Sequence, residues 1–386
     1  MTDVLIVGAG PAGSVAALVL ARAGADVRLV DVASFPRAKL CGDTINPGAL
    51  AIADRLGIGS IVRTRARTIT GMRLTGPGGV AVAADYSHGL HGVALERRTL
   101  DSLFVDAAIA AGVDFLPGVH ALAPLVDGDD RIAGARVRTP AGVSEMRARL
   151  VIAAEGRHSR LGAALGLTRF ARSPKRWAFG TYFTGVDGVT SRGEMHVRTD
   201  GYVGIAPLGD DVANVCVVRS AGRGRAVPVA NRTRPCFDAV VTNAISGDPE
   251  LRDRFTHARR VSPVVSLGPL ACEAAEAGCP GLLLAGDAAG FVDPMTGDGL
   301  RFALRGGELA AEAALDELAT GRPAHVRLGA ALGRELAPKR RLNRILRALV
   351  GWPRGVRLAA TLASHWEAPF RLLIDVAGDV HGVRPE

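Results

Sequence analysis

The segment from residue 3 to residue 31 constrains the fold of this chain more than any other part of the sequence. An apolar run from Val4 to Val7 leads into Gly8-Ala9-Gly10-Pro11-Ala12-Gly13, and Ala and Leu then recur with helical spacing until Gly24. A second apolar run ends at Asp31. A strand, a helix and a strand within about thirty residues fit a right-handed crossover between parallel strands. We therefore predict a doubly wound α/β domain here.

The glycines of this turn suit a dinucleotide. A pyrophosphate binds against a helix N-terminus, where side chains at Gly8, Gly10 and Gly13 would block it. Asp31 stands 18 positions after Gly13, where a carboxylate can accept hydrogen bonds from a ribose diol. The alternative is a tight strand-to-helix turn without a ligand. The fingerprint alone does not distinguish NAD from FAD.

The composition describes a globular chain and excludes several classes of protein. Of 386 residues, 48% are hydrophobic and 22% charged, so a large core can form. The net charge of +9 comes almost wholly from Arg, and no nucleic-acid recognition motif accompanies it, so we expect no nucleic-acid partner. The five cysteines include no Cys-x-x-Cys pair, so we expect no metal site. No basic leader and no run of about 18 apolar residues is present, which favours a cytoplasmic protein.

The rest of the chain divides by its pattern. Polar and apolar residues alternate within residues 176–268, which is typical of an antiparallel sheet. Short apolar strands at 150–154 and 281–285 flank this region, so we expect the dinucleotide-binding domain to be discontinuous. The predicted fold is α/β, or α+β overall, with an inserted antiparallel β-sheet domain and C-terminal helices. We assign residues 1–75, 95–170 and 275–325 to the dinucleotide-binding domain, 76–94 and 171–274 to a β-rich substrate domain, and 326–386 to a C-terminal helical segment.

Four further motifs follow in order. The segment from Phe35 to Asp43 reads Phe-Pro-Arg-Ala-Lys-Leu-Cys-Gly-Asp, and Arg97 precedes Asp101 in an amphipathic helix predicted over 99–112. Ala154-Glu155-Gly156 ends a strand, and residues 285–291, Ala-Gly-Asp-Ala-Ala-Gly-Phe, precede Thr296-Gly297-Asp298-Gly299-Leu300. With these motifs the sequence resembles, from about residue 3 to 310, the FAD-dependent geranylgeranyl reductase family. That family lies within the superfamily of p-hydroxybenzoate hydroxylase and the flavin-dependent halogenases.

The resemblance implies a non-covalently bound FAD. Asp287 would accept from a ribityl hydroxyl, and the turn at 296–300 would present backbone N–H groups to the flavin N1 and C2 carbonyl. Arg97, or Arg98 in its place, would reach the FAD phosphates or ribityl chain, and Cys41 would contact the flavin rather than act as a nucleophile. The cofactor-binding residues implied in this way are Gly8, Gly10, Pro11, Ala12, Gly13, Asp31, Arg37, Lys39, Cys41, Gly42, Arg97, Gly286, Asp287, Gly297, Asp298, Gly299 and Leu300.

Two departures from the family pattern concern the strand end and the substrate. The family's Asp-Gly is Glu155-Gly156 here, and the longer side chain puts its contact with a cofactor in doubt. The family's Tyr-x-Trp-x-Phe-Pro pattern corresponds to residues 202–207, Tyr-Val-Gly-Ile-Ala-Pro, which lack the Trp. The substrate is therefore expected to be hydrophobic, either isoprenoid or polyketide-like. The residues expected to line its cavity are Tyr202, Gly204, Ala206 and Pro207.

The residues favour one redox reaction among those that the fold serves. Halogenation is disfavoured, because no Lys occurs between Lys39 and Lys175 and the halogenase Trp-x-Trp-x-Ile-Pro pattern is missing. Gly290 stands where many aromatic hydroxylases carry a His, which favours the reductase-like form. We therefore predict C=C reduction or dehydrogenation by flavin hydride transfer, with NAD(P)H-dependent monooxygenation as the alternative and a flavin-free lipid- or prenyl-protein-binding module as the second. The scattered histidines identify no catalytic acid or base.

The sequence also bears on the electron donor and on the role of the basic C-terminal segment. A second Gly-x-Gly-x-x-Gly is missing, so NAD(P)H, as the reductant, would bind transiently near the flavin. The basic C-terminal helices would contact an acidic electron donor or an anionic membrane surface, or would form only a solubilising cationic face. Their basic residues are Lys339, Arg340, Arg341, Arg344, Arg347, Arg354 and Arg357.

Overall fold

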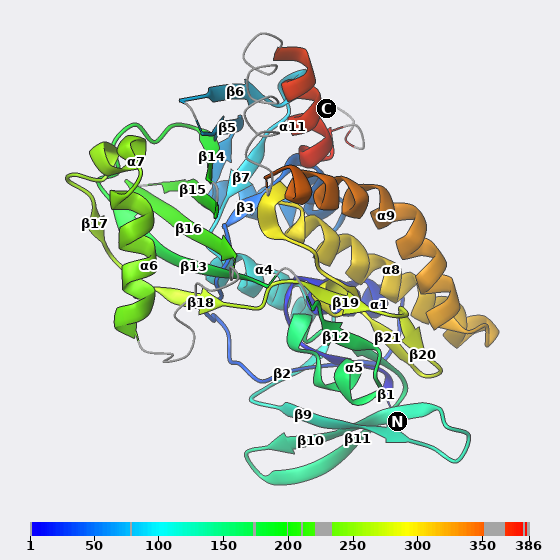
Figure 1. Cartoon of the computed structure of the whole chain (residues 1–386). Coiled ribbons are helices and arrows are strands. Elements are labelled where there is room, and N and C mark those ends of the chain that lie inside the picture. The colour runs from blue at the N-terminus through cyan, green and yellow to red at the C-terminus, as the bar shows by residue number, and fades with distance from the viewer. Residues whose placement is uncertain are drawn as a thin grey trace.

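The computed structural model describes residues 2–77, 79–172, 175–198, 200–209, 211–220, 234–350, 367–380 and 383. Its first sheet has β1 between two parallel neighbours, β2 and β11, in the order β20-β21-β11-β1-β2-β8 (Figure 1). β1 and β2 are apolar because helices and loops cover both faces of a parallel sheet. A meander of two further strands extends β11. The strands are β1 (Thr2–Val7), β2 (Val27–Asp31), β8 (Asp114–Pro117), β9 (His120–Val126), β10 (Ile132–Thr139), β11 (Gly142–Ala153), β20 (Gly278–Cys279) and β21 (Leu282–Leu284).

Three helices form the layer beside this sheet. α1 (Pro11–Arg22) joins β1 to β2 and packs against α4 (Arg97–Ala110) and α8 (Gly299–Thr320). The axes of α1 and α8 approach closely at Gly307, where a Cβ would lie 2.4 Å from the Ala12 carbonyl oxygen. The β1-α1-β2 unit begins and ends as the sequence predicts, and α4 begins two residues before the predicted helix.

The second sheet lies beside the first and is mostly antiparallel, in the order β17-β13-β16-β15-β14-β5-β6. β5 falls within the range 1–75 that we assigned to the first domain, yet it pairs in parallel with β14 of this sheet. The strands are β5 (Gly71–Thr75), β6 (Ala81–Asp85), β13 (Arg176–Thr184), β14 (Arg192–Arg198), β15 (Gly201–Gly209), β16 (Val212–Ser220), β17 (Arg259–Arg260) and β18 (Val265–Leu267).

Two helices cover one face of the second sheet, where the sequence pattern indicated only strands. α6 (Arg234–Ser246) places Val241 and Ala244 in the core against β13, β15 and β16. α7 (Pro249–Arg254) begins where the Asp248 side chain accepts hydrogen bonds from the backbone N–H groups of Glu250 and Leu251. The antiparallel sheet predicted from residues 176–268 is therefore interrupted by α6 and α7, because helix capping and the helical spacing of apolar residues decide the structure there.

Shorter elements link the two sheets. β3, β7 and β4 form a three-stranded sheet, and β12 pairs with β19. α2 begins at an Asn46 cap, whose side-chain oxygen accepts from the backbone N–H of Ala49. These elements are β3 (Thr44–Ile45), α2 (Pro47–Arg55), α3 (Gly59–Arg65), β4 (Arg67–Ile69), β7 (Gly92–Ala94), α5 (Arg160–Ala164), β12 (Thr168–Phe170) and β19 (Cys272–Ala274).

The described C-terminal part is helical. α9 (Ala324–Val350) packs along α8, and α11 (Glu367–Gly378) lies against β6 (Figure 1). Of the basic residues noted here, Arg341 and Arg344 are exposed and Lys339 is buried, whereas Arg354 and Arg357 lie outside the described residues. The predicted fold class, a doubly wound domain with an inserted sheet and C-terminal helices, is confirmed.

Candidate active site

The glycine turn after β1 has two kinds of glycine. A Cβ at Gly8, whose φ is +103°, would lie 2.4 Å from the Ala154 carbonyl oxygen, and a Cβ at Gly13 would lie 1.8 Å from the Gly8 carbonyl oxygen. These two glycines allow the turn to pack. A Cβ at Gly10 would meet only the guanidinium of Arg37, at 3.5 Å, and would otherwise enter open space. Gly10 therefore keeps room at the N-terminus of α1 for a ligand.

Asp31 at the end of β2 holds the turn in place. Its Oδ2 accepts a hydrogen bond from the backbone N–H of Ala9 at 2.7 Å, and its Oδ1 accepts from the backbone N–H of Ala33 at 2.8 Å. Each carboxylate oxygen keeps capacity for a second donor, such as a ribose hydroxyl.

A cavity of about 430 Å³ begins at this turn and continues between the two sheets. It brings together most of the residues that the sequence implied, from segments far apart in the chain. Those that line it are Gly10, Pro11, Ala12, Lys39, Cys41, Gly42, Arg97, Gly286, Asp287, Gly297, Gly299, Leu300, Tyr202, Gly204 and Ala206. Those outside its lining are Gly8, Gly13, Asp31, Arg37, Asp298 and Pro207.

Arg97 is held by an acidic partner. Its Nε and Nη2 donate to Asp101 at 2.8 and 3.0 Å, and Arg37 approaches the same carboxylate at 3.3 Å. Burial acts to lower the pKa of Arg97, but Asp101 outweighs it and the pKa is raised. From the sequence, Asp101 was recognised only as part of the helix motif, and no role was predicted for it. Its carboxylate fixes both cations beside the groove. Arg98, the alternative to Arg97, is exposed.

Lys39 and Arg157 line the cavity, and within the described part of the chain neither forms a hydrogen bond or an ion pair. Burial lowers the pKa of both side chains, and the nearby Asp287 opposes that effect. Two such cations facing a groove are suited to an anionic ligand. Arg157 was not predicted from the sequence, although it directly follows Glu155-Gly156.

Glu155 takes part in a helix cap. Its carboxylate accepts hydrogen bonds from the Ser159 hydroxyl at 2.7 Å and from the backbone N–H groups of Arg160 and Leu161 at 3.1 and 3.3 Å. These contacts orient it toward α5. The longer side chain that stands in place of the family's Asp is thus explained by the start of this helix.

The second glycine-bearing loop also lines the cavity and packs against the N-terminal turn of α1. Gly286 has a φ of +64°, and a Cβ there would lie 2.8 Å from the Ala12 side chain, so only glycine lets this loop approach α1. Gly297 has a φ of +69° with nothing within 4 Å of a Cβ, and among the described residues no donor binds the Asp287 carboxylate. Open space at Gly10 and Gly297, together with Asp287 and Lys39, which have no side-chain partner among the described residues, fits a dinucleotide with hydroxyl and phosphate groups, such as FAD.

Asp43 joins the Cys41-Gly42 segment to the second sheet. Its carboxylate accepts hydrogen bonds from the Tyr182 hydroxyl at 2.9 Å, the Asn214 amide at 2.7 Å and the backbone N–H of Arg97 at 3.1 Å. Asn214 also donates to the Cys41 carbonyl oxygen at 2.9 Å. No role was predicted for Asp43 from the sequence motif, because its partners on β13 and β16 are distant in the chain.

The ionisation of Asp43 should make stability depend on pH. Burial raises its pKa from 3.8 to about 6, against the hydrogen bonds from Tyr182 and Asn214. The folded state therefore binds the Asp43 proton more tightly than the unfolded state does. Protonated Asp43 contributes about 3 kcal/mol to the free energy of unfolding below pH 3.8, and this contribution is lost as the pH rises through about 6. We expect the free energy of unfolding of Asp43→Asn, measured in urea from pH 4 to 7, to lack this component. Asp129→Asn, which removes an exposed carboxylate, is the control, and an identical pH profile for Asp43→Asn and the natural protein would contradict the expectation.

Beyond the groove the cavity is apolar. Tyr202, Gly204 and Ala206 of β15 form part of its wall, and α11 closes its far end with Phe370 and Ile374. The Tyr202 hydroxyl donates to Asp293 at 3.0 Å, and Arg176 donates to the other oxygen of that carboxylate at 2.8 Å. The buried Arg176–Asp293 pair therefore fixes the side chain that stands where the family's Tyr does.

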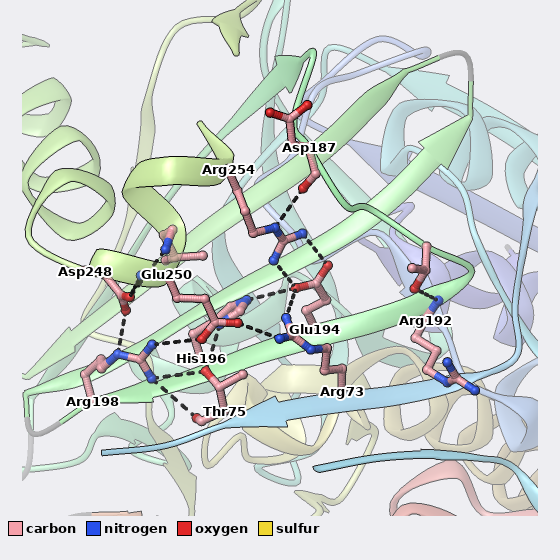
Figure 2. A network of polar contacts seen from close by, with 12 residues as sticks. Arg73, Thr75, Asp187, Arg192, Glu194, His196, Arg198, Asp248, Glu250 and Arg254 are labelled. Carbon is pink, nitrogen blue, oxygen red and sulfur yellow. Dashed lines mark hydrogen bonds and ion pairs between the residues drawn. The ribbon is translucent and has the colours of Figure 1, made fainter. Parts of the chain in front are cut away.

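The opposite face of the second sheet carries a separate polar network (Figure 2). His196 is fully buried, with Nδ1 2.8 Å from the Thr75 hydroxyl and Nε2 3.0 Å from Glu194. Arg254 of α7 donates to both oxygens of Glu194 at 2.6 and 2.8 Å. Burial acts to raise the pKa of Glu194, but the hydrogen bonds from Arg254 and His196 outweigh it and lower the pKa to about 2. This network attaches α7 and β5 to β14, so His196 faces away from the cavity.

The comparisons with known proteins agree with this geometry. The profile of a family described as FAD binding domain matches residues 1–307. Menaquinone reductase of Mycobacterium tuberculosis is 34% identical over 327 residues, 80% of this chain and 76% of that protein. Digeranylgeranylglycerophospholipid reductase 2 of Methanopyrus kandleri is 32% identical over 325 residues, 82% of this chain and 77% of that protein.

Solved structures share the fold. A geranylgeranyl bacteriochlorophyll reductase-like protein from Thermoplasma acidophilum superposes with a TM-score of 0.78 at 22% identity, covering 98% of this chain and 91% of that one. A flavin-dependent brominase superposes with a TM-score of 0.85 at 19% identity, covering 98% and 93%. No helix in the described part of the chain has the length and apolarity needed to cross a bilayer. On its family match, its relatives and its two facing glycine loops, the chain belongs to the FAD-binding domain family, among the FAD-dependent oxidoreductases of the geranylgeranyl reductase type.

Proposed function

We propose that this FAD-dependent oxidoreductase reduces a carbon–carbon double bond of a hydrophobic, isoprenoid-type substrate. The apolar cavity that continues from the nucleotide groove to α11 carries the proposal, because it offers a long chain a dry path past the cofactor site. The named activities of the relatives, menaquinone reductase and digeranylgeranylglycerophospholipid reductase, support the same class of substrate.

Several residues of the chain serve such a reaction. When bound and reduced, FAD supplies the hydride. The apolar wall excludes water from the reacting bond, and the Arg176–Asp293 pair orients Tyr202 within that wall. Cys41 and Cys216 both line the cavity, and burial raises the pKa of Cys216 to about 12, so its thiol is neutral at physiological pH.

NAD(P)H is the reductant that we propose. With Lys39 serving FAD, Arg157 is left for the diphosphate of NAD(P)H, and none of the described carboxylates neutralises its charge through an ion pair. Arg157→Met is expected to raise the KM for NAD(P)H and to leave the folded state intact, as measured by steady-state kinetics and circular dichroism.

The reaction type is tested by single turnover without oxygen. The holoenzyme is reduced, mixed anaerobically with a prenylated quinone or a geranylgeranyl lipid, and followed at ~450 nm, where oxidised flavin absorbs. We expect flavin reoxidation together with a product that has gained two hydrogens. Turnover only after oxygen is admitted, with a product that has gained an oxygen atom, would establish monooxygenation instead.

The cavity wall is tested at Gly204. Its Cβ would lie 3.8 Å from the Cys216 carbonyl oxygen and 3.9 Å from the Glu194 carbonyl oxygen, which is ordinary contact, so Gly204→Ala should behave as the natural protein does. Gly204→Trp should fill the cavity and lower kcat/KM for the prenylated substrate by about tenfold or more while FAD stays bound. Unchanged kcat/KM in Gly204→Trp would place the substrate elsewhere.

A further inference from the structure

The loop that carries both cavity motifs, residues 285–298, is anchored by one face of α9. Arg340 donates to the carbonyl oxygens of Ala289 and Gly290 at 3.0 and 3.3 Å. Asn343 donates to the Asp293 carbonyl oxygen and to the Thr296 hydroxyl, both at 2.9 Å. The third anchor is Lys339, whose Nζ donates to Asp298 at 2.8 Å. All three belong to a helix that begins after residue 307, where the family match ends.

Asp298 is the one charged side chain in the turn at 296–300. Thr296, Gly297, Gly299 and Leu300 line the cavity, whereas the Asp298 side chain lies outside the lining and is 4% exposed. Burial raises its pKa, and the charge and hydrogen bond of Lys339 oppose that effect. Asn46 adds a hydrogen bond at 3.3 Å. The turn at 296–300 thus lines the cavity on one side, and the buried Asp298–Lys339 ion pair lies on its other side.

The other charged residues around Lys339 have further ion-pair partners, so Asp298 is the residue that depends on Lys339. Asp379 lies 3.4 Å from Lys339 Nζ, but it also accepts from Arg301 at 2.6 Å, and Arg301 is paired with Glu335 as well. Asp298 has no cationic partner besides Lys339 within the described residues. Without Lys339, a buried carboxylate would stand beside the cavity turn with no cation to balance it.

We propose that Lys339 is a positioning residue for FAD: by neutralising Asp298 it holds the turn at 296–300 in place and sets the reduction potential of the bound flavin. An unbalanced carboxylate behind this turn disfavours the negative charge that the flavin gains on reduction, because buried charges interact through a low effective dielectric. An unbalanced ammonium favours it. The C-terminal helix would therefore tune the cofactor from outside the FAD-binding domain.

The opposite signs of the two charges provide the test. In the full-length holoenzyme, Lys339→Met should shift the flavin midpoint potential to more negative values, and Asp298→Asn should shift it to more positive values. The double variant should lie near the natural protein. The potentials are measured by dye-equilibrated spectroscopic titration. The dissociation constant of oxidised FAD, from fluorescence quenching, should rise by about tenfold in Lys339→Met.

The control and the contrary outcomes separate charge from structure. Arg341→Met removes an exposed positive charge from the same helix and should leave the midpoint potential unchanged. Shifts of the midpoint potential that have the same sign in Lys339→Met and Asp298→Asn, or that are no larger than in Arg341→Met, would overturn the proposal. The ion pair would then only stabilise the fold. If Lys339→Met does not retain FAD, the signs of Asp298→Asn and of the double variant decide the matter.

Discussion

Replacing Gly10 with valine is expected to abolish FAD binding while the protein still folds. A side chain at Gly10 meets only the mobile end of Arg37, at 3.5 Å, and projects into the groove at the N-terminus of α1. A pyrophosphate must lie against these backbone N–H groups, so the side chain and the ligand compete for one space. We expect the affinity for FAD to fall by about 100-fold or more, with flavin absorbance lost on purification.

Substitution of Gly13 should differ from that of Gly10, because a side chain at Gly13 would clash with the backbone. A Cβ at Gly13 would lie 1.8 Å from a backbone oxygen, so Gly13→Ala should lower the free energy of unfolding by about 3 kcal/mol as well as releasing FAD. Gly333→Ala, on α9 with nothing within 4 Å of the new Cβ, should retain both FAD and stability. Full flavin occupancy in Gly10→Val would show that the cofactor does not use this turn.

Replacing Arg176 with methionine should cost about 3–5 kcal/mol of unfolding free energy, because it leaves a buried carboxylate without its cation. The Arg176 side chain is 7% exposed and that of Asp293 is 1% exposed. Asp293 also accepts from the Tyr202 hydroxyl and from the backbone N–H of Met295 at 3.1 Å. The loss should therefore loosen the cavity wall and the flavin-binding loop together.

Adding Asp293→Asn to Arg176→Met should recover most of this loss, since the amide oxygen still accepts from Tyr202 and the charge is gone. The exposed Arg192–Asp85 pair, with side chains 35% and 51% exposed, gives the matched control. Arg192→Met should change the free energy of unfolding by less than about 1 kcal/mol. Urea unfolding of these three variants and of the natural protein measures all these values, and equal losses for Arg176→Met and Arg192→Met would contradict the prediction.

The dinucleotide-binding unit could be predicted because its signals are local. The spacing of Gly8, Gly10 and Gly13 between two apolar runs specifies a strand, a turn and a helix, and Asp287 follows another buried strand. The carboxyl ends of parallel strands meet at one edge of a sheet, so motifs at those ends were expected to come together, and the cavity lining contains most of them. The family match over residues 1–307 spans these motifs.

Roles that depend on how side chains pair in the folded protein could not be predicted. Arg97 lines the cavity where it is expected to reach the FAD phosphates or ribityl chain, but its pairing with Asp101 was not predicted, nor was the orientation of Glu155 by the helix that follows it. The helices α6 and α7 were missed because strand-like alternation around them dominated the pattern.

The sequence by itself determined the chemistry that this protein can hold: a glycine turn without side chains, a strand-end acid and a second glycine loop define a dinucleotide site, since backbone conformation there depends on nearest neighbours. The tertiary structure alone decided which charges are balanced. Asp293 meets Arg176 and Asp298 meets Lys339 across long separations in the chain, whereas Asp43 is held by the neutral hydroxyl of Tyr182. Burial makes each of these pairings costly to break, and burial is a property of the assembled fold.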